Sequence, residues 1–436
     1  MADLFESLPT GVQAELRVSK VHTAGVRFAN SEFEGTRETL HEVSALRVVK
    51  DGRMSLAAST KPGSDRELLD AALEAAKYGT PVPEGFSFPG PAGIPQISLV
   101  SEETRAAGLA QMIAVGEDLT SAMLAHDRRL RVMAAAERDE IEVSLRNTAG
   151  FSGSYAKTVW SSGVGCQLVQ GEDFLFFGES RTRVDPHEDY DGLKREVIQV
   201  FDWARETAPF AAGAYPVIFA PSEVSYLMAP FLACLNGKAF ARGVSPLRER
   251  MGQQLLDPRI TLVDDGTLAD VPASAPFDRE GVPTRRNVLV EAGVPRTLLL
   301  DLQTAAELKL EPTGNGRGSG PGPNHVLLQP GDTALDDMIR GIELGLIIYG
   351  SMGAWAGNPY GGNVSGTISL GLRIEKGRIA GRVKNCMFSV NAFEHFRDRV
   401  LALSRETKQL GGGGVGGGAA TYPYVLLDGV VVSTNA

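Results

Sequence analysis

Six histidines and three cysteines are the side chains that could bind a metal in this 436-residue chain. None of the histidines stands four or five residues from another, so no helix can present a pair of imidazoles to zinc. His41-Glu42 and His187-Glu188 begin like a zinc-peptidase motif, but each lacks the second histidine. The spacing therefore favours surface or loop histidines. The full set is His22, His41, His126, His187, His325, His395, Cys166, Cys234 and Cys386.

Nucleophilic and phosphate-binding motifs are equally weak. Ser154 and Lys157 satisfy Ser-x-x-Lys, but they enter a predicted strand, whereas the pattern is useful only on one helical turn. Gly411 to Gly418 matches Gly-x-Gly-x-x-Gly only because nearly every position is glycine, and it lacks the Lys-Ser/Thr of a phosphate loop. Cys386 follows a predicted strand and is typical of a buried structural cysteine. A site assembled from distant residues, such as Cys386 with His395, stays open.

Polar and aromatic side chains in glycine- and proline-punctuated loops suggest peptide binding. Side-chain amides can pair with an extended backbone, and aromatic rings can line apolar pockets beside it. The same residues could instead satisfy their own loops through Asx-type turns. The sequence alone favours neither reading. The candidates for contact with a peptide or a partner are Asn315, Arg317, Asn324, Tyr349, Trp355, Asn358, Tyr360 and Asn363.

Composition excludes several functional classes. A net charge of −10 argues against a nucleic-acid interface, which needs clustered Lys and Arg. The longest apolar run, near Leu344 to Trp355, is interrupted by glycines and too short to span a bilayer, so no membrane role is predicted. Three cysteines far apart in sequence form no disulfide framework, which indicates a reducing cytoplasm.

The first half of the chain reads as helices and antiparallel hairpins, which predicts an α+β fold. We expect a hairpin over Ala45–Thr60 and helices over Ser64–Tyr78 and Glu102–His126. Two further hairpins are expected, turning at Arg138-Asp139 and at 171–173. The predicted division is an N-terminal region, 1–208, with sub-domains at about 20–90 and 100–208, and a C-terminal domain, 209–436.

The second half predicts a β-rich domain with flanking helices. A short strand from Val217 to Ala220 precedes a helix with Ser222 as its N-cap and Gly243 beyond its end. We expect a further helix over Asn391–Glu406. The tail, YPYVLLDGVVVST, is expected to form a final pair of strands.

Four stretches of this half, VDDGTL, RRNVLVEAGV, LQTAAELKL and TGNGR, resemble the TldD/TldE (PmbA) family, which is metallopeptidase-related. The likeness extends over most of the chain from about His41. In the TldD branch, a His-Glu-x-x-x-His zinc motif lies on the helix after the short strand; its positions are held here by Met228, Ala229 and Ala233. That branch also takes a cysteine ligand from a glycine-rich loop, and 411–418 has none. The chain thus resembles the TldE/PmbA branch.

The resemblance implies a subunit with no catalytic residue and no metal ligand of its own. It would pair with a TldD-like chain that carries His-Glu-x-x-x-His and a zinc-like metal, and the pair would cleave unfolded peptides during peptide maturation or protein degradation. Two alternatives remain: an autonomous, homodimeric enzyme using Cys386, His325 or His395, and a peptide-binding adaptor.

Overall fold

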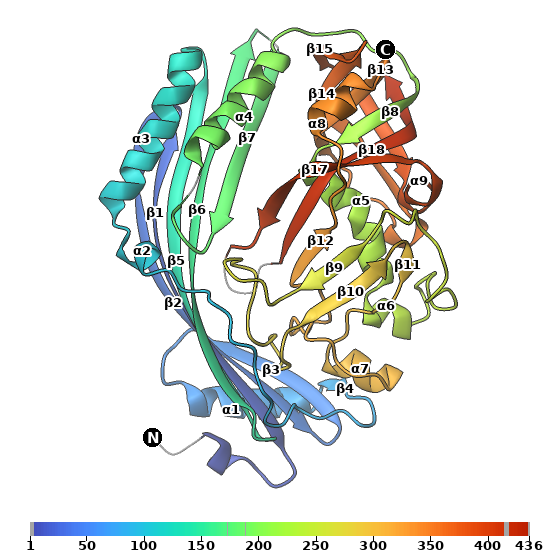
Figure 1. Ribbon diagram of the computed structural model, residues 1–436. Helices are drawn as coiled ribbons and strands as arrows, with labels where there is room; N and C mark the ends of the chain where they lie inside the picture. The colour runs from blue at the N-terminus through green and yellow to red at the C-terminus, as the bar shows by residue number, and fades with distance from the viewer. Residues whose placement is uncertain (1–3, 172, 188, 414–417, 435–436) are drawn as a thin grey trace.

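The computed structural model describes residues 4–171, 173–187, 189–413 and 418–434, and it contains two β-sheets with helices packed against them (Figure 1). One sheet is built from the first half of the chain and the other from the second half. Strands and helices are not in regular βαβ alternation, and most neighbouring strands are antiparallel. The predicted α+β class is confirmed.

Sheet A has seven strands and is antiparallel throughout. Its long central strands carry alternating buried and exposed residues over part of their length, as expected where opposite faces meet different surroundings. In sheet order the strands are β4 (Thr80–Pro81), β3 (Arg53–Ser59), β2 (Glu32–Lys50), β1 (Gln13–Ala29), β5 (Arg131–Asn147), β6 (Ser152–Gln170) and β7 (Asp173–Arg183).

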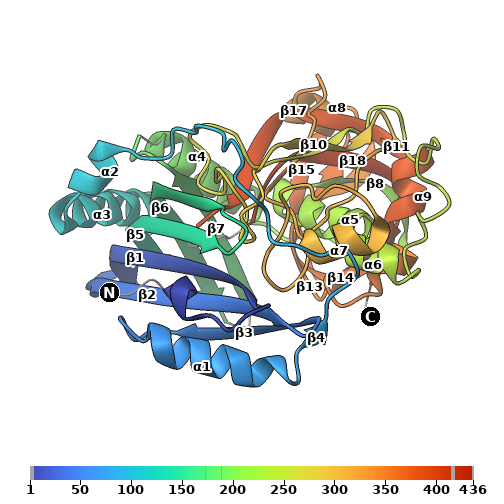
Figure 2. The same ribbon diagram turned by 90° about the horizontal axis from the view of Figure 1, so that it is seen from below.

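Helices cover one face of sheet A. The helix Asp65–Ala76 lies at the lower end of the sheet and the helix Leu109–His126 at its upper end (Figures 1 and 2). Leu68 and Leu69 of the first helix share a core with Leu46, and Met112 of the second shares a core with Val132. The opposite face, called the open face below, carries no helix from this half. The elements outside the sheet are η1 (Leu4–Ser7), α1 (Asp65–Ala76), α2 (Glu102–Ala106), α3 (Leu109–His126) and α4 (Tyr190–Trp203).

The turn expected at Arg138-Asp139 is wrong. β5 runs unbroken through both residues and pairs with β1 on one side and β6 on the other. Asp139 is buried and accepts a hydrogen bond from Thr23 Oγ1 at 2.5 Å. A charged pair in sequence resembles a turn, but here a cross-strand hydroxyl satisfies the carboxylate inside the sheet.

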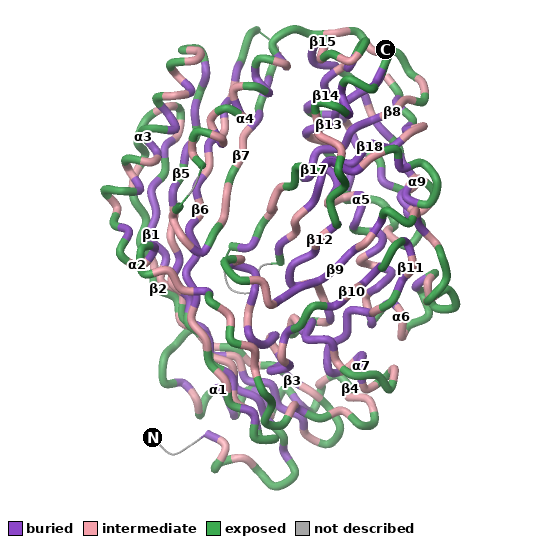
Figure 3. The backbone as a smooth tube through the Cα atoms, in the orientation of Figure 1, coloured by how far each residue is buried: buried purple, intermediate pink, exposed green. Residues whose placement is uncertain are grey.

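Sheet B has eleven strands and mixes parallel and antiparallel pairs. Two of its short strands are buried at nearly every position, as the purple trace of β9 and β12 shows in Figure 3. The strands are β8 (Gly213–Phe219), β9 (Leu262–Asp265), β10 (Arg286–Glu291), β11 (Val294–Pro295), β12 (His325–Leu328), β13 (Leu344–Met352), β14 (Asn363–Glu375), β15 (Arg378–Val383), β16 (Cys386–Asn391), β17 (Val400–Gly411) and β18 (Ala419–Thr434).

Helix α5 (Pro221–Cys234) packs on sheet B and forms the centre of its core. Ala220 is the N-cap residue, so the cap expected at Ser222 is wrong: Pro221 already occupies the first turn, where its fixed φ is compatible with a helix. The other helical elements are α6 (Gly237–Ala241), α7 (Leu302–Leu308), α8 (Leu335–Arg340), η2 (Pro359–Gly361) and α9 (Ala392–Asp398).

Two predicted elements near the C-terminus differ in the structure. The helix expected over Asn391–Glu406 ends at Asp398, and β17 begins at Val400. The expected final strand pair is one continuous strand, β18, although its register shifts between Leu427 and Val430 where it pairs with β8. The Asp428-Gly429 pair resembles a hairpin turn, yet pairing with β8 continues beyond it.

The two sheets are joined by buried polar contacts and by a shared apolar core. Arg47 of β2 donates to Glu280 Oε1 at 2.5 Å, and Arg382 of β15 donates to Asp173 at 2.5 Å. The core containing α3 and α4 continues into Ile218 and Ile347 of sheet B. Among the described residues, no helix has the length and apolar character needed to cross a membrane.

Candidate functional site

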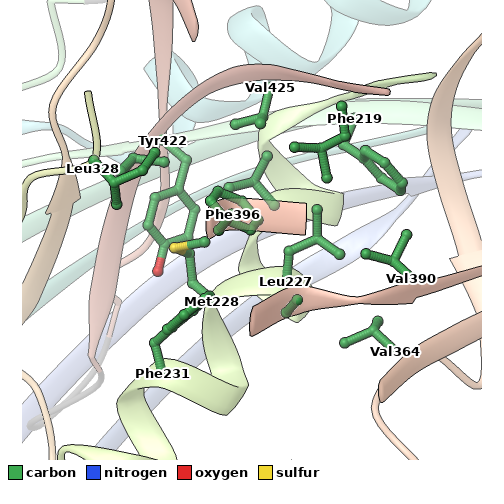
Figure 4. Packing of buried hydrophobic residues seen from close by; sticks show 14 of the residues in the cluster. Phe219, Leu227, Met228, Phe231, Leu328, Val364, Val390, Phe396, Tyr422 and Val425 are labelled. Atoms are coloured by element: carbon green, nitrogen blue, oxygen red, sulfur yellow. The ribbon is translucent and has the colours of Figure 1, made fainter. Parts of the chain in front are cut away.

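The three zinc-motif positions on α5 are not arranged as ligands. Met228 is buried and packs against Phe231 and its neighbours (Figure 4), Ala229 is exposed, and Ala233 is half-buried. Across the described part of the chain, no group of three or more His, Cys, Asp and Glu could hold a metal ion. The residues present therefore do not fit the metal that a zinc peptidase needs.

Asp264 on β9 organises the loop that follows α7. Its carboxylate accepts the backbone N–H of Asn324 at 2.6 Å, the backbone N–H of His325 at 3.0 Å and the side-chain amide of Asn315 at 2.7 Å. Burial raises the pKa of Asp264 to about 6, although these hydrogen bonds oppose the shift. Residues far apart in sequence are thereby held at one point.

Asn315 and Asn324 therefore come together around Asp264, and the charge of Arg317 lies close enough to act on the same carboxylate. Asn315 is fully buried, and its amide also donates to the carbonyl of Gly322 at 3.1 Å. The Asn324 amide donates to the carbonyl of Gly314 at 2.9 Å. Contact between these amides and a peptide would require the loop to open. The sequence did not point to Asp264, because the VDDGTL segment contains no spacing of residues that is typical of a binding or metal site.

A second group of candidates gathers beside α5. Trp355 is 66% exposed, and its ring lies 6.0 Å from that of Tyr226 on α5. Asn358 caps η2 by accepting the N–H of Tyr360 at 3.1 Å. The side-chain amide of Asn391 donates a hydrogen bond to Asn363 Oδ1 at 3.0 Å, so the side chains of Asn363 and Asn391 bind each other within the protein.

Tyr349 belongs to neither group. It is buried between sheets A and B, with its ring 5.6 Å from Phe177 and 6.3 Å from Tyr424. Burial raises its pKa well above the usual range of a tyrosine. Its position assigns it to packing in this structure.

Lys157, which the sequence suggested only as part of a Ser-x-x-Lys pattern, is a buried cation. It is 2% exposed, and its ammonium donates to the carbonyl of Pro272 at 2.6 Å. Burial, with the charges of Arg317, Arg17 and Arg279, lowers its pKa to about 8. Ser154 is exposed on the same strand, and positions three apart in a strand point to opposite faces, so the Ser-x-x-Lys pair cannot act together.

Of the groups named for an autonomous enzyme, His325 and Cys386 are buried and His395 is half-buried. Burial lowers the pKa of His325 to about 4, and its Nε2 lies 2.8 Å from Thr421 Oγ1. Burial raises the pKa of the Cys386 thiol, which is 1% exposed. His395 Nδ1 lies 2.9 Å from the carbonyl of Asn391. An imidazole whose pKa is lowered to about 4 is a weak base, and a thiol whose pKa is raised stays protonated and is a poor nucleophile.

A groove crosses the upper open face of sheet A. Its volume is about 610 Å³, within the range of ligand-binding clefts, and its far wall is the end of β17. No motif pointed to it, because its lining comes from side chains on separate strands of sheet A and from the tip of a strand in the other sheet. Residues lining it include Met133, Ala135, Ser161, Phe176, Gln409 and Leu410.

Comparison with known proteins agrees with the sequence resemblance. Residues 212–434 match the family described as PmbA/TldA metallopeptidase C-terminal domain, and 14–77 match PmbA/TldA metallopeptidase domain 1. A "Metalloprotease" of Methanothermobacter thermautotrophicus is 29% identical over 48% of this chain, a match that spans only 47% of that protein's length. "Metalloprotease PmbA" of Escherichia coli O157:H7 is 23% identical over 89% of this chain and 86% of its own.

The fold also has a solved counterpart. The crystal structure of TldE from Thermococcus kodakarensis superposes with a TM-score of 0.87, covering 97% of this chain and 96% of that one at 22% identity. At this identity the match supports the fold alone. Together with the family match over the C-terminal half, these findings show that the chain belongs to the TldD/TldE (PmbA) family of metallopeptidase-related proteins.

Proposed function

We propose that this chain is the TldE/PmbA-like subunit of a TldD/TldE-type metallopeptidase and that it holds no metal itself. The observation that carries the proposal is helix α5, on which Met228 is a core residue and Ala229 and Ala233 bear methyl groups. A peptidase of this class needs imidazole ligands and a carboxylate that activates water. Family membership together with these substitutions supports a supporting role in a complex rather than independent zinc catalysis.

The expected partner is a TldD-like chain that contributes His-Glu-x-x-x-His and a zinc-like metal. The name "Metalloprotease TldD homolog" among the relatives, for example in Buchnera aphidicola, is consistent with two related branches. The proposed substrate of the complex is an unfolded or extended peptide. Because the metal site would lie in the other chain, this chain would position the substrate and support its partner.

The test is to recover the tagged chain from its native cytosolic extract, identify what accompanies it and measure metal in the complex and in the isolated chain. We expect a His-Glu-x-x-x-His partner, metal only in the complex, and chelator-sensitive cleavage of unfolded peptides only when both chains are present. Stoichiometric zinc in the isolated chain, or chelator-sensitive cleavage by it alone, would contradict the proposal.

A further inference from the structure

The groove on the open face of sheet A lies between two strands that are incompletely paired. β7 is the last strand of sheet A, and β17 pairs only with β18 among the described strands (Figure 1). Backbone contacts with Gly331 and Thr333 cover β17 near Ser404 and Arg405. In the part of the chain that the structure describes, residues 407–410 show no main-chain partner outside the β17–β18 pairing.

Side chains fix the position of β17 beside sheet A. Lys408 forms an ion pair with Glu179 of β7 at 2.7 Å and another with Glu196 of α4. Gln409 donates to the carbonyl of Thr182 on β7 at 2.9 Å. The wall of the groove is therefore set before any ligand arrives, which reduces the ordering cost of binding.

Large apolar side chains lie exposed at the groove. Met133 is 38% exposed and Phe176 is 46% exposed, and both line the cavity. Further along these strands the lining is short: Ala135 and Ser161 leave the strands accessible to a ligand. Apolar pockets beside an unpaired strand edge are the features used to bind an extended peptide by strand addition.

Charges around the groove are already paired. Arg27 lies 2.9 Å from Glu34, and Glu137 accepts from Arg37 at 2.8 Å. Glu179 is neutralised by Lys408. Since no surplus of one sign faces the cavity, it is better matched to an uncharged main chain with small and apolar side chains than to a nucleotide or another multiply charged ligand.

We propose that this groove binds an extended peptide segment, which pairs through its main chain with the outer edge of β17 at 407–410. The apolar side chains of the peptide contact Met133 and Phe176. Four to six residues of extended peptide span roughly 13–20 Å, at about 3.3 Å per residue. The inference rests on the proposed peptidase function, because it gives the chain without metal its own contact with the substrate.

The probe is a fluorescent, end-blocked hexapeptide of alternating Ala and Val, offered to the isolated full-length chain and measured by anisotropy. Two further peptides carry N-methyl groups on either the odd or the even residues, which removes the N–H donors along one edge only. We expect one methylation pattern to weaken binding about tenfold or more and the other to change it little. Equal affinity of both patterns and the parent, or no binding at all, would overturn the proposal.

A groove-filling variant locates the site. Ala135→Trp places a large side chain on an exposed strand position in the cavity, and Thr36→Trp places one on an exposed position of β2 outside it. We expect Ala135→Trp to reduce binding about tenfold and Thr36→Trp to leave it unchanged, with both variants checked for folding by circular dichroism. Bound peptide should also slow amide exchange in 407–410, which needs no variant; equal binding by both variants without that protection would contradict the inference.

These experiments separate the inference from the proposed function. If the chain co-purifies with a metal-bearing partner and supports cleavage but does not bind the peptide, only the groove assignment is wrong. If the groove binds peptide with the expected strand-edge signature but no such partner exists, only the subunit proposal is wrong.

Discussion

His325 illustrates how burial alone can remove a residue from the list of catalytic candidates. Its imidazole is 1% exposed and meets Thr421, while the neighbouring carboxylate of Asp264 binds its backbone N–H instead of its ring. The pKa of His325 falls to about 4 because the charged ring would be desolvated. The consequence belongs to stability rather than to catalysis.

We predict that His325 makes the fold sensitive to mild acid. The imidazole pKa is lower in the folded state, so the unfolded state binds more protons and stability falls as pH decreases from above 6.5 toward 4. Between pH 7 and pH 5 this amounts to roughly 2 kcal/mol. His325→Asn should lose less stability over that interval than the natural chain, by urea unfolding at each pH. The exposed His41→Asn variant is the control, and an acid sensitivity identical in all three proteins would contradict the prediction.

Helix α5 and the short hairpins show what the elements contribute. In α5, the position of the first histidine of the zinc motif is occupied by Met228, which packs in the apolar core. In the β10–β11 hairpin, Gly293 adopts φ +82°, and a Cβ there would lie 2.2 Å from the carbonyl oxygen of Leu256. The surroundings of each element thus limit which side chains its positions can carry.

Restoring the motif letters on α5 should not restore a metal site. We predict that Met228→His/Ala229→Glu/Ala233→His binds no stoichiometric zinc, because position 228 lies in the apolar core and, among the described residues, no cluster of His, Cys, Asp and Glu supplies further ligands. Metal content after dialysis against zinc measures this. Ala229→Glu alone, at an exposed position, is the folding control. One tightly bound zinc per triple-variant chain would show that the helix reorganises around metal.

The turn glycines provide a matched pair for separating strain from collision. Gly52 has φ +70° with open space around it, whereas Gly293 has a similar φ and a backbone oxygen in the way. We predict that Gly52→Ala costs about 1–2 kcal/mol of unfolding free energy through the left-handed conformation alone. Gly293→Ala should cost clearly more, measured by chemical denaturation. Equal losses would mean that the loop near Leu256 moves aside freely.

At the scale of the whole molecule, a buried ion triad links the two sheets. Arg47 donates to Glu15 within sheet A and to Glu280 from the second half of the chain, and Glu280 also accepts the N–H of Leu302 at the start of α7. Burial raises the pKa of Glu15 to about 7 even with the guanidinium beside it. The contact fixes the second half of the chain on the lower open face of sheet A.

Removing the guanidinium should loosen that junction in a pH-dependent way. We predict that Arg47→Met destabilises the chain by about 3–5 kcal/mol at pH 8, because it leaves two buried carboxylates without a cation. The loss should shrink toward pH 5, since the folded state then gains a proton on Glu15, whose pKa lies above its unfolded value. Thermal and urea unfolding at both pH values test this. Arg296→Met, in an exposed pair with Glu291, should change stability by less than about 1 kcal/mol; a pH-independent loss for Arg47→Met would contradict the reasoning.

The fold class, the family and most local elements follow from the order of the amino acids alone, because they depend on periodicity, turn residues and short motifs. The hairpin turn at Asp51-Gly52 and the helix after Ser64 are examples, since neighbours along the chain specify both. The absence of a histidine pair on α5 could likewise be read directly from the letters. Predictions from local pattern were wrong where a residue distant in sequence determines the structure. Asp139 stays in a strand, where Thr23 donates a hydrogen bond to it. Strand β18 continues past its Asp-Gly pair because β8 pairs with it beyond that point.

Which candidate residues lie together, and where a ligand can bind, depends on how distant segments of the chain are arranged in space. The tertiary structure placed Asn315 and Asn324 around Asp264, buried Tyr349 between the sheets and left Trp355 exposed. It also created the groove, whose walls come from Met133 of β5, Phe176 of β7 and the end of β17. Such a cavity depends on the relative positions of two sheets built from distant parts of the chain, and that relation is set by long-range packing and buried charges, which no local pattern encodes.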